Sequence, residues 1–238
     1  MKPLWVTTLA AALWVGCLGV KTVFVIQPDG GFEPILTDNG LADWHCFPEN
    51  LANDWSVKDG QLIGRSSGKG SYLMWKGGDL RDFELKFDYK LVTDGNTGLQ
   101  VRSIKHDSES HPLQGYHVDI GHVGIGEKVL GAWDFHPGHR GDYLAKRGEQ
   151  VTLLPGNKRK TERIESAFES TDANKRNWNH VHVYARGNAM WFTINSKVAS
   201  KVIDENPEDR IDAGKIAFQL HSGHGMHVIF KDVLLKRH

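Results

Sequence analysis

The stretch that decides the fold is DFELKFDYKL at residues 82–91. Its apolar residues, Phe83, Leu85, Phe87 and Tyr89, alternate with charged ones, so they fall on one face of an extended chain. Alternation over this length predicts a β-strand with one buried and one solvated face. Similar short runs lie at residues 55–57, 61–63, 97–104, 180–185, 189–194, 215–220 and 227–235. Turn sequences rich in Gly, Asn and Asp separate these runs, and the whole pattern predicts an all-β sandwich or barrel.

Length and composition fit one large domain. The chain has 238 residues, and a loop with the sequence QPDGG at residues 27–31 precedes the first strand signals, so we expect the domain over residues 27–238. A domain of this size can bury a full core without disulfides. None is expected, because the two cysteines are Cys17, in the leader, and Cys46. The 29 basic and 29 acidic residues balance, which argues against nucleic acid as a partner.

The N-terminus predicts export to the periplasm or the extracellular space. Lys2 precedes an apolar run from Leu4 to Val20, which is typical of a leader over residues 1–20. Three interpretations stay open. The leader is removed after Gly19, or the sequence WVGC at residues 14–17 is a lipoprotein signal that leaves a lipid anchor on Cys17, or the run is an uncleaved membrane anchor.

Two long stretches between the strand signals differ in composition. Residues 123–158 are rich in Gly, His and charge, which predicts long loops with short strands, and loops of this length are often functional. Within them, residues 136–142 could border a ligand groove or form a solvated turn. Residues 158–174 are highly charged and could carry a short helix.

Three predicted strands each place a pair of hydrogen-bonding side chains on one face, because residues two apart in a strand point the same way. The pairs are Gln100 and Arg102, His117 and Asp119, and Gln219 and His221. A face that is polar only because water covers it is expected to carry Lys, Glu, Thr and Ser. Amide, guanidinium, imidazole and carboxylate groups instead favour a face that binds hydroxyls, carbonyls or metals. The pattern therefore predicts a site for a sugar-like ligand on this face.

Seven short segments carry a resemblance to a known family. In chain order they are GFEPIL (31–36), NTGLQVRS (96–103), GYHVDIG (115–121), GAWD (131–134), NWNH (177–180), IAFQLHSG (216–223) and VIFKDV (228–233). They resemble, in this order, segments of the 3-keto-disaccharide hydrolase domain family, from Gly31 to Leu235. The chain departs from the family pattern at Trp133, where Tyr is usual, and at His117, where many relatives carry Gln.

The resemblance implies a concanavalin-like jelly-roll sandwich of two curved antiparallel sheets with a ligand groove on the concave face. It also implies a hydrolase, or a lyase or hydratase, that acts on glycosides whose C3 hydroxyl has become a ketone. A separate sugar 3-dehydrogenase would then act upstream. Some members depend on a metal, so a divalent cation such as Mn, Zn, Co or Ca is an expected cofactor.

Cleavage of such a substrate requires a base for the C2 proton, an electrophile at the ketone oxygen and an acid for the leaving oxygen. We expect four catalytic residues: Asp119, His117, Arg102 and Asp134. His117 and Asp119 can bind one metal ion from a single strand, with His221 as the third ligand, and such N and O donors suit the cations named above. Alternatives stay open, because each His could be a surface imidazole and Arg102 could form an ion pair with Asp119.

The expected substrate-binding residues are Gln100, Gln219, Trp133 and Asn96, with Trp133 as a platform for a sugar ring. Trp178 is expected in the core. A non-catalytic carbohydrate-binding module is the alternative function, and the mixture of Arg, His and Asp on the polar face favours catalysis. A retaining glucanase is disfavoured because no E-x-D-x-x-E strand is present. No Gly-rich dinucleotide-binding turn follows a strand, which argues against an oxidoreductase.

Overall fold

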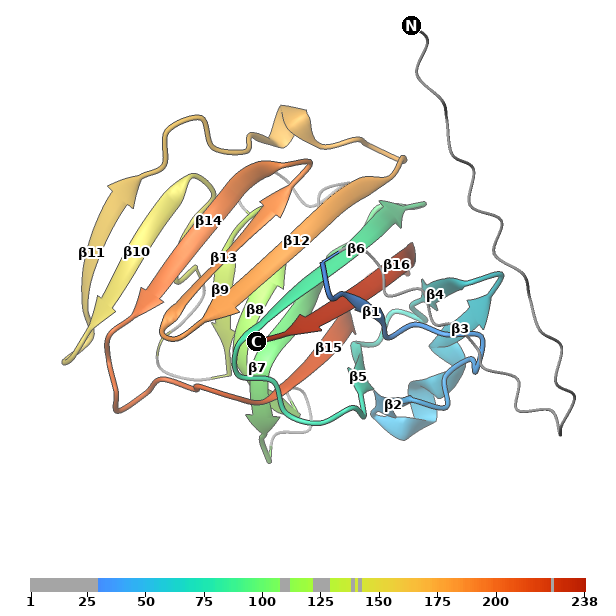
Figure 1. The fold of residues 1–238 in the computed structure, drawn as a ribbon. Coiled ribbons are helices and arrows are strands. Elements are labelled where there is room, and N and C mark those ends of the chain that lie inside the picture. Colours follow the sequence, from blue (N-terminus) through green and yellow to red (C-terminus); the bar gives the residue numbers. More distant parts are fainter. Residues whose placement is uncertain (1–29, 108–111, 122–128, 138–139, 141–142, 224) are drawn as a thin grey trace, which may run out of the picture.

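The computed structural model describes residues 30–107, 112–121, 129–137, 140, 143–223 and 225–238. The predicted leader with Cys17, and residues 138, 139, 141 and 142 of the predicted groove border, lie outside the described residues. Two sheets stack face to face, with the larger one in front in Figure 1. No helix among the described residues is long and apolar enough to cross a membrane.

The larger sheet has ten strands in the described part of the chain. In spatial order they are β11 (Lys158–Arg163), β10 (Glu149–Leu154), β14 (Lys197–Asp204), β13 (Ala189–Ile194), β12 (Asn179–Arg186), β6 (Phe83–Leu91), β16 (His227–Arg237), β4 (Gln61–Arg65) and β3 (Trp55–Lys58), with β1 (Glu33–Pro34) paired to β16. Neighbouring strands are antiparallel except β10 and β14, which are parallel.

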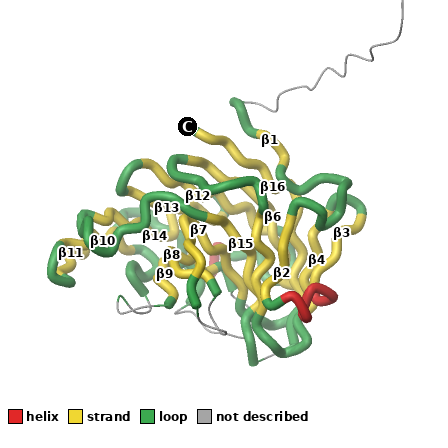
Figure 2. Tube along the Cα trace, turned by 90° about the horizontal axis from the view of Figure 1, so that it is seen from below, coloured by secondary structure: helices red, strands yellow, loops and turns green. Residues whose placement is uncertain are grey.

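The smaller sheet has six strands, all antiparallel to their neighbours. In spatial order they are β2 (Trp44–Phe47), β5 (Ser71–Trp75), β15 (Lys215–Leu220), β7 (Thr97–Lys105), β8 (Leu113–Asp119) and β9 (Trp133–His136). Figure 2 gives a second view of the two layers. The all-β prediction is therefore confirmed.

The alternating stretch at residues 82–91 forms β6, which lies in the middle of the larger sheet between β12 and β16. Its apolar side chains are buried between the sheets. There the Phe87 ring packs edge-on against Phe218 of β15 at 5.3 Å, and Phe218 lies 4.3 Å from Phe230 of β16. The side chains of both sheets thus interdigitate in one core.

The two long stretches are only partly irregular. Residues 123–158 contribute β9 and β10 to the two sheets. In residues 158–174 the first six form strand β11, with every residue exposed, and the expected short helix is the three-residue 3-10 helix η2 (Ser170–Asp172). A second 3-10 helix, η1 (Glu49–Asp54), follows β2 and was not predicted.

Candidate functional site

The candidate site lies on the outer face of the smaller sheet, opposite the core. Cross-strand pairing there creates two rows of side chains, because directly opposed residues share a face. One row runs through Tyr72, Gln219, Gly98 and Asp119, and the other through Ala217, Gln100, His117 and Asp134. The expected face is thus present, and it brings together residues from β5, β15, β7, β8 and β9.

Gly98 makes room for His117. A Cβ at residue 98 would lie 2.2 Å from Nε2 of His117 and 2.5 Å from the Val118 carbonyl oxygen, both far inside van der Waals contact. The imidazole therefore lies over the backbone of β7 and points toward Gln219. Only glycine at this position lets a ring from β8 reach toward β15.

Two histidines and two aspartates form a cluster at the β8–β9 edge of this face. Nδ1 of His117 lies 3.3 Å from Oδ1 of Asp119, and Nε2 of His136 lies 3.4 Å from Oδ2 of Asp134. The His117 and His136 rings are 5.4 Å apart. Three of these residues, His117, Asp134 and His136, each offer a donor atom within 4.8 Å of the others.

Burial decides the charge state of the cluster. It lowers the pKa of His117 to about 3, helped by the neighbouring His136 and opposed by Asp134, so the imidazole is neutral at pH 7. Burial alone would raise the pKa of Asp134, but hydrogen bonds from the His136 ring and the Tyr143 amide hold it below its usual value. A neutral imidazole next to an ionised carboxylate is the form in which both bind metals.

A cavity of about 460 Å³ opens in front of the cluster. His117, Asp119, Asp134 and His136 line one part of it, and Tyr72, Asn96, Gln219 and His221 line another. Nε2 of Gln219 donates a hydrogen bond to the Tyr72 hydroxyl at 3.2 Å, while Oε1 of Gln219 has no hydrogen-bond partner among the described residues. The volume is that of a small-molecule site, and most of the residues that line it carry a group that can bond hydroxyls.

A sequence profile of the 3-keto-alpha-glucoside-1,2-lyase-like domain matches residues 31–236, nearly the whole described chain. The chain belongs to this family. None of the curated proteins matches it.

Solved structures share the fold at low sequence identity. A candidate glycosyl hydrolase from Parabacteroides distasonis is 16% identical with a TM-score of 0.57, over 87% of this chain and 94% of that chain. A Bacillus subtilis protein of unknown function with a galectin-like fold has the same TM-score and coverage at 10% identity. The carbohydrate-binding module CBM66 of Bacillus subtilis has a TM-score of 0.52 at 13% identity, over 82% and 95% of the two chains. These structural similarities confirm the jelly-roll fold predicted for this chain.

The donor set fits the divalent cation that the family implies. His117, Asp134 and His136 supply two imidazole nitrogens and a carboxylate oxygen, and Nε2 of the buried His117 has no hydrogen-bond partner among the described residues. The backbone amide of Tyr143 donates to Oδ1 of Asp134, which orients the carboxylate. Zn, Mn or Co suits such ligands better than Ca, which prefers oxygen donors alone.

The structure changes part of the expected ligand set. His221 lines the same cavity but is exposed, and its Nδ1 lies 2.6 Å from the Ser222 carbonyl oxygen. Neither His221 nor Asp119, the other expected ligand outside the group, belongs to the three residues, whereas Asp134 and His136 do. His136 was missed as a ligand, although its spacing of two residues from Asp134 on one strand was a usable signal. Tyr72 was missed because its strand carries no polar pattern, and Tyr143 was missed because it lies outside the strands.

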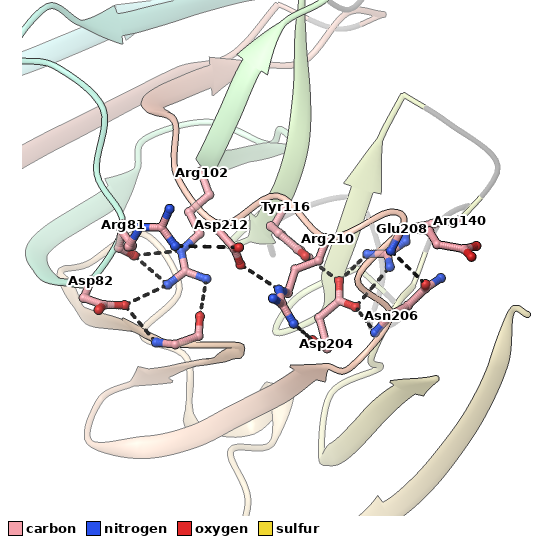
Figure 3. Close-up of polar contacts among 11 residues, drawn as sticks. Arg81, Asp82, Arg102, Tyr116, Arg140, Asp204, Asn206, Glu208, Arg210 and Asp212 are labelled. Carbon is pink, nitrogen blue, oxygen red and sulfur yellow. Dashed lines mark hydrogen bonds and ion pairs between the residues drawn. The ribbon is translucent and has the colours of Figure 1, made fainter. Parts of the chain in front are cut away.

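The expectation that Arg102 faces the groove beside Gln100 is wrong. The register of β7 against β8 shifts between Val101 and Ile104, and Arg102 has a φ of 46°, so the alternation breaks there. The Arg102 guanidinium is fully buried and donates to the carbonyl oxygens of Arg81 and Gly187, with Asp82 at 3.3 Å. Figure 3 shows this cluster. An ion pair of Arg102 with Asp119 is likewise excluded.

The remaining expected binding residues divide in two groups. Asn96 and Gln219 line the cavity, and Gln100 lies beneath it, where its Oε1 accepts a hydrogen bond from Ser103 at 2.8 Å. Trp133 is not a sugar platform, because it is fully buried between the sheets, packs against Phe192 and donates to the Ser200 carbonyl oxygen. Trp178 is not in the core either, since it is only half-buried, with the amines of Lys90 and Lys231 over its ring.

Proposed function

We propose that this protein cleaves glycosides whose C3 hydroxyl has been oxidised to a ketone, by removing the C2 proton and eliminating the group at C1. The observation that carries the proposal is the buried cluster of His117, Asp119, Asp134 and His136 facing a sugar-sized polar cavity. Family membership supports the same reaction class. A sugar-binding face alone has no need for four titratable groups at one point.

The chemistry requires two linked steps. The C2–H bond breaks, its electron pair forms an enediolate with the C3 oxygen, and the base holds the proton. The pair then forms a C1–C2 double bond, the C1–O bond breaks, and the leaving oxygen takes a proton. The product is an enone, or a 3-keto sugar if water adds back across the double bond. The first step is the same whether the protein acts as a lyase or as a hydrolase.

Asp119 is the proposed base. Its carboxylate lines the cavity, is nearly buried, and lies beside His117 but outside the three-residue donor group. A buried carboxylate positioned against the substrate contributes about 10²–10⁴-fold to a proton transfer. His117, two residues before Asp119 on the same strand, lies against the carboxylate, with its Nδ1 3.3 Å from Oδ1 of Asp119.

His117, Asp134 and His136 would hold the divalent cation. When bound, such an ion stabilises negative charge on the C3 oxygen as a Lewis acid. These three side chains come from the neighbouring strands β8 and β9, where His117 pairs directly with Asp134.

Tyr72 is the proposed proton donor to the leaving oxygen. Burial raises the pKa of Tyr72, opposed by Gln219 and Gln100, so its hydroxyl stays protonated at pH 7. Tyr72 and Asp119 belong to one cross-strand row, three strands apart. At about 4.8 Å per strand their backbones are about 14 Å apart, which the two side chains and the C2–C1–O segment of the sugar between them can span.

The ketone would come from a separate oxidoreductase that acts on the C3 hydroxyl of the parent glycoside, since the sequence has no Gly-rich dinucleotide-binding turn after a strand. The predicted leader would place the protein outside the cytoplasm. If the sequence WVGC at residues 14–17 is a lipoprotein signal, a lipid on Cys17 would anchor the protein to a membrane.

The test is release of the alcohol from a 3-keto-glucoside and from its unoxidised parent, with and without a chelator. We expect release only from the keto substrate, loss of activity with chelator, and a decrease of about 100-fold or more in Asp119→Asn. Asp38→Asn, an exposed carboxylate elsewhere, is the control and should keep full activity. Binding of the sugar without release would favour a carbohydrate-binding module instead.

A further inference from the structure

A second, smaller apolar cluster lies outside the main core. Tyr72, Leu113 and Ala217 are buried together, with Met74 packed against them. Ala217 pairs with both Met74 and Gln100, in the same cross-strand row as His117. The cluster is therefore on the face of the smaller sheet that carries the candidate site.

An apolar recess opens above this cluster. It is another cavity of about 460 Å³, and it shares Tyr72 and Pro112 with the polar cavity, so the two adjoin. Its apolar walls come from Phe47, Met74, Ile104 and Leu113. In contrast to the polar cavity, most of this lining is apolar, and the groups on its border that can bond a sugar hydroxyl are few, among them Ser103, His45 and His106.

Ile104 is unusual for a surface residue. Its side chain is 45% exposed, and Val92 is the other large exposed hydrophobic side chain in the described part of the chain. The register shift in β7 that buries Arg102 lies between Val101 and Ile104. The same irregularity thus removes a cation from this face and leaves Ile104 on the recess wall.

The charges that border the recess largely cancel. Nζ of Lys215 lies 2.9 Å from Oδ1 of Asp79, so these two charges form an ion pair, and Lys105 adds one further cation on the border. Burying a sugar against Phe47, Met74 and Ile104 would leave its hydroxyls without partners, which is costly. A planar apolar ring loses nothing there and gains contact with an aromatic face and a thioether.

We propose that this recess binds an apolar, aromatic leaving group, while the 3-keto sugar occupies the polar cavity. The inference rests on the proposed function and names its substrate class: glycosides of aromatic alcohols rather than disaccharides. Tyr72 lies where the two cavities meet, and this is where the bond between sugar and leaving group would fall. Because the two cavities adjoin at Tyr72 and Pro112, the group attached to C1 of a sugar in the polar cavity would lie in the recess.

The first experiment compares 3-keto-glucosides with benzyl, methyl and glucosyl leaving groups, because these alcohols leave with similar intrinsic ease. We expect kcat/KM for the benzyl substrate to exceed the other two by about tenfold or more, the effect of one well-filled apolar pocket. Ile104→Asn should lower kcat/KM for the benzyl substrate to about that for the methyl substrate. Val92→Asn, the same exchange at the other exposed hydrophobic residue, should retain it.

The second experiment measures binding without turnover. Calorimetry with unoxidised benzyl and methyl glucosides should give about tenfold tighter binding of the benzyl compound, lost in Ile104→Asn and kept in Val92→Asn. If benzyl binding depends on Ile104 but no keto substrate is cleaved, the recess stands and the proposed function fails. If keto substrates are cleaved without benzyl preference, or both variants behave alike, the recess proposal is overturned.

Discussion

Gly98 shows how one residue without a side chain determines the site. The His117 ring occupies the space that a Cβ at residue 98 would fill, with its Nε2 2.2 Å from that position. The alternation in the sequence correctly predicts that His117 and Asp119 share the outer face. It could not predict the contact with Gly98, because that contact depends on the register between β7 and β8.

Gly98→Ala should destabilise the protein by about 1–3 kcal/mol, because the new methyl group overlaps the His117 ring and a backbone carbonyl. Urea unfolding measures the effect. Gly225→Ala is the control, since a Cβ there meets its nearest atom at an ordinary 3.5 Å. Equal stability of the two variants would contradict the assigned position of His117.

The proposed metal ligands give a second test at the residue scale. His136→Ala should lower the affinity for Zn by about 10-fold or more, because it removes one of three donors. His221→Ala should change the affinity little, since that exposed ring is outside the group. Competition with a chromophoric chelator measures both. A larger loss of Zn affinity in His221→Ala than in His136→Ala would instead identify His221 as the third ligand.

His182 provides a test of pH dependence away from the site. Burial lowers its pKa to about 4, with Lys86 as the next cause and Glu84 in opposition. The unfolded chain takes up the proton first, so stability is full above pH 6.5 and is lost as the pH falls from 6.5 to 4. The buried His117 contributes in the same direction.

The free energy of unfolding decreases between pH 6.5 and pH 4, and in His182→Gln this decrease should be smaller by roughly 2 kcal/mol. Urea unfolding at a series of pH values measures it. His180→Gln is the control, because the His180 side chain is on the same strand but 49% exposed. An unchanged pH dependence in His182→Gln would show that this imidazole is not held neutral by the fold.

At the scale of the element, β7 is where sequence and structure differ most. A regular strand over residues 97–105 would place Gln100 and Arg102 on one face. The bulge after Val101 instead buries Val101, Arg102 and Ser103 in succession. A period-two pattern cannot locate an inserted residue, because the sequences before and after the bulge are each regular. The error in the predicted role of Arg102 follows directly from this.

Arg102→Met should cost about 2–4 kcal/mol of stability, because it leaves the Arg81 and Gly187 carbonyl groups without their donor. Arg176→Met should cost less than about 1 kcal/mol, since Arg176 and Asp94 form an exposed pair. The folded fraction of Arg102→Met should keep kcat within a few-fold. A loss of kcat with normal stability would show instead that Arg102 takes part in catalysis.

At the scale of the whole molecule, buried polar contacts join the two sheets. The Tyr116 hydroxyl of β8 donates to Asp204 of β14, and Arg140 forms an ion pair with the same carboxylate (Figure 3). The Ser200 hydroxyl of β14 donates to the Gly131 carbonyl oxygen just before β9. These contacts hold β8 and β9, which carry the His–Asp cluster, against the larger sheet.

The layered fold could be predicted, because alternating strands and the order of the short motifs are local properties of the sequence. The outer polar face could be predicted for the same reason, through His117, Asp119 and Gln219. The links of Tyr116 and Arg140 to Asp204 could not, since they join residues 88 and 64 positions apart, respectively. The membership of His136 and Tyr72 in the site likewise depends on which strands are neighbours.

The central claim is that the outer face of the smaller sheet abstracts a proton from C2 of a 3-keto sugar. Its most direct test follows methyl 3-keto-glucoside in D₂O by NMR, with the same substrate without protein as the background. We predict that methanol is released together with the loss of the C2 proton, and that Asp119→Asn slows both by about 100-fold or more. Methanol release from a sugar that retains its C2 proton would contradict the account.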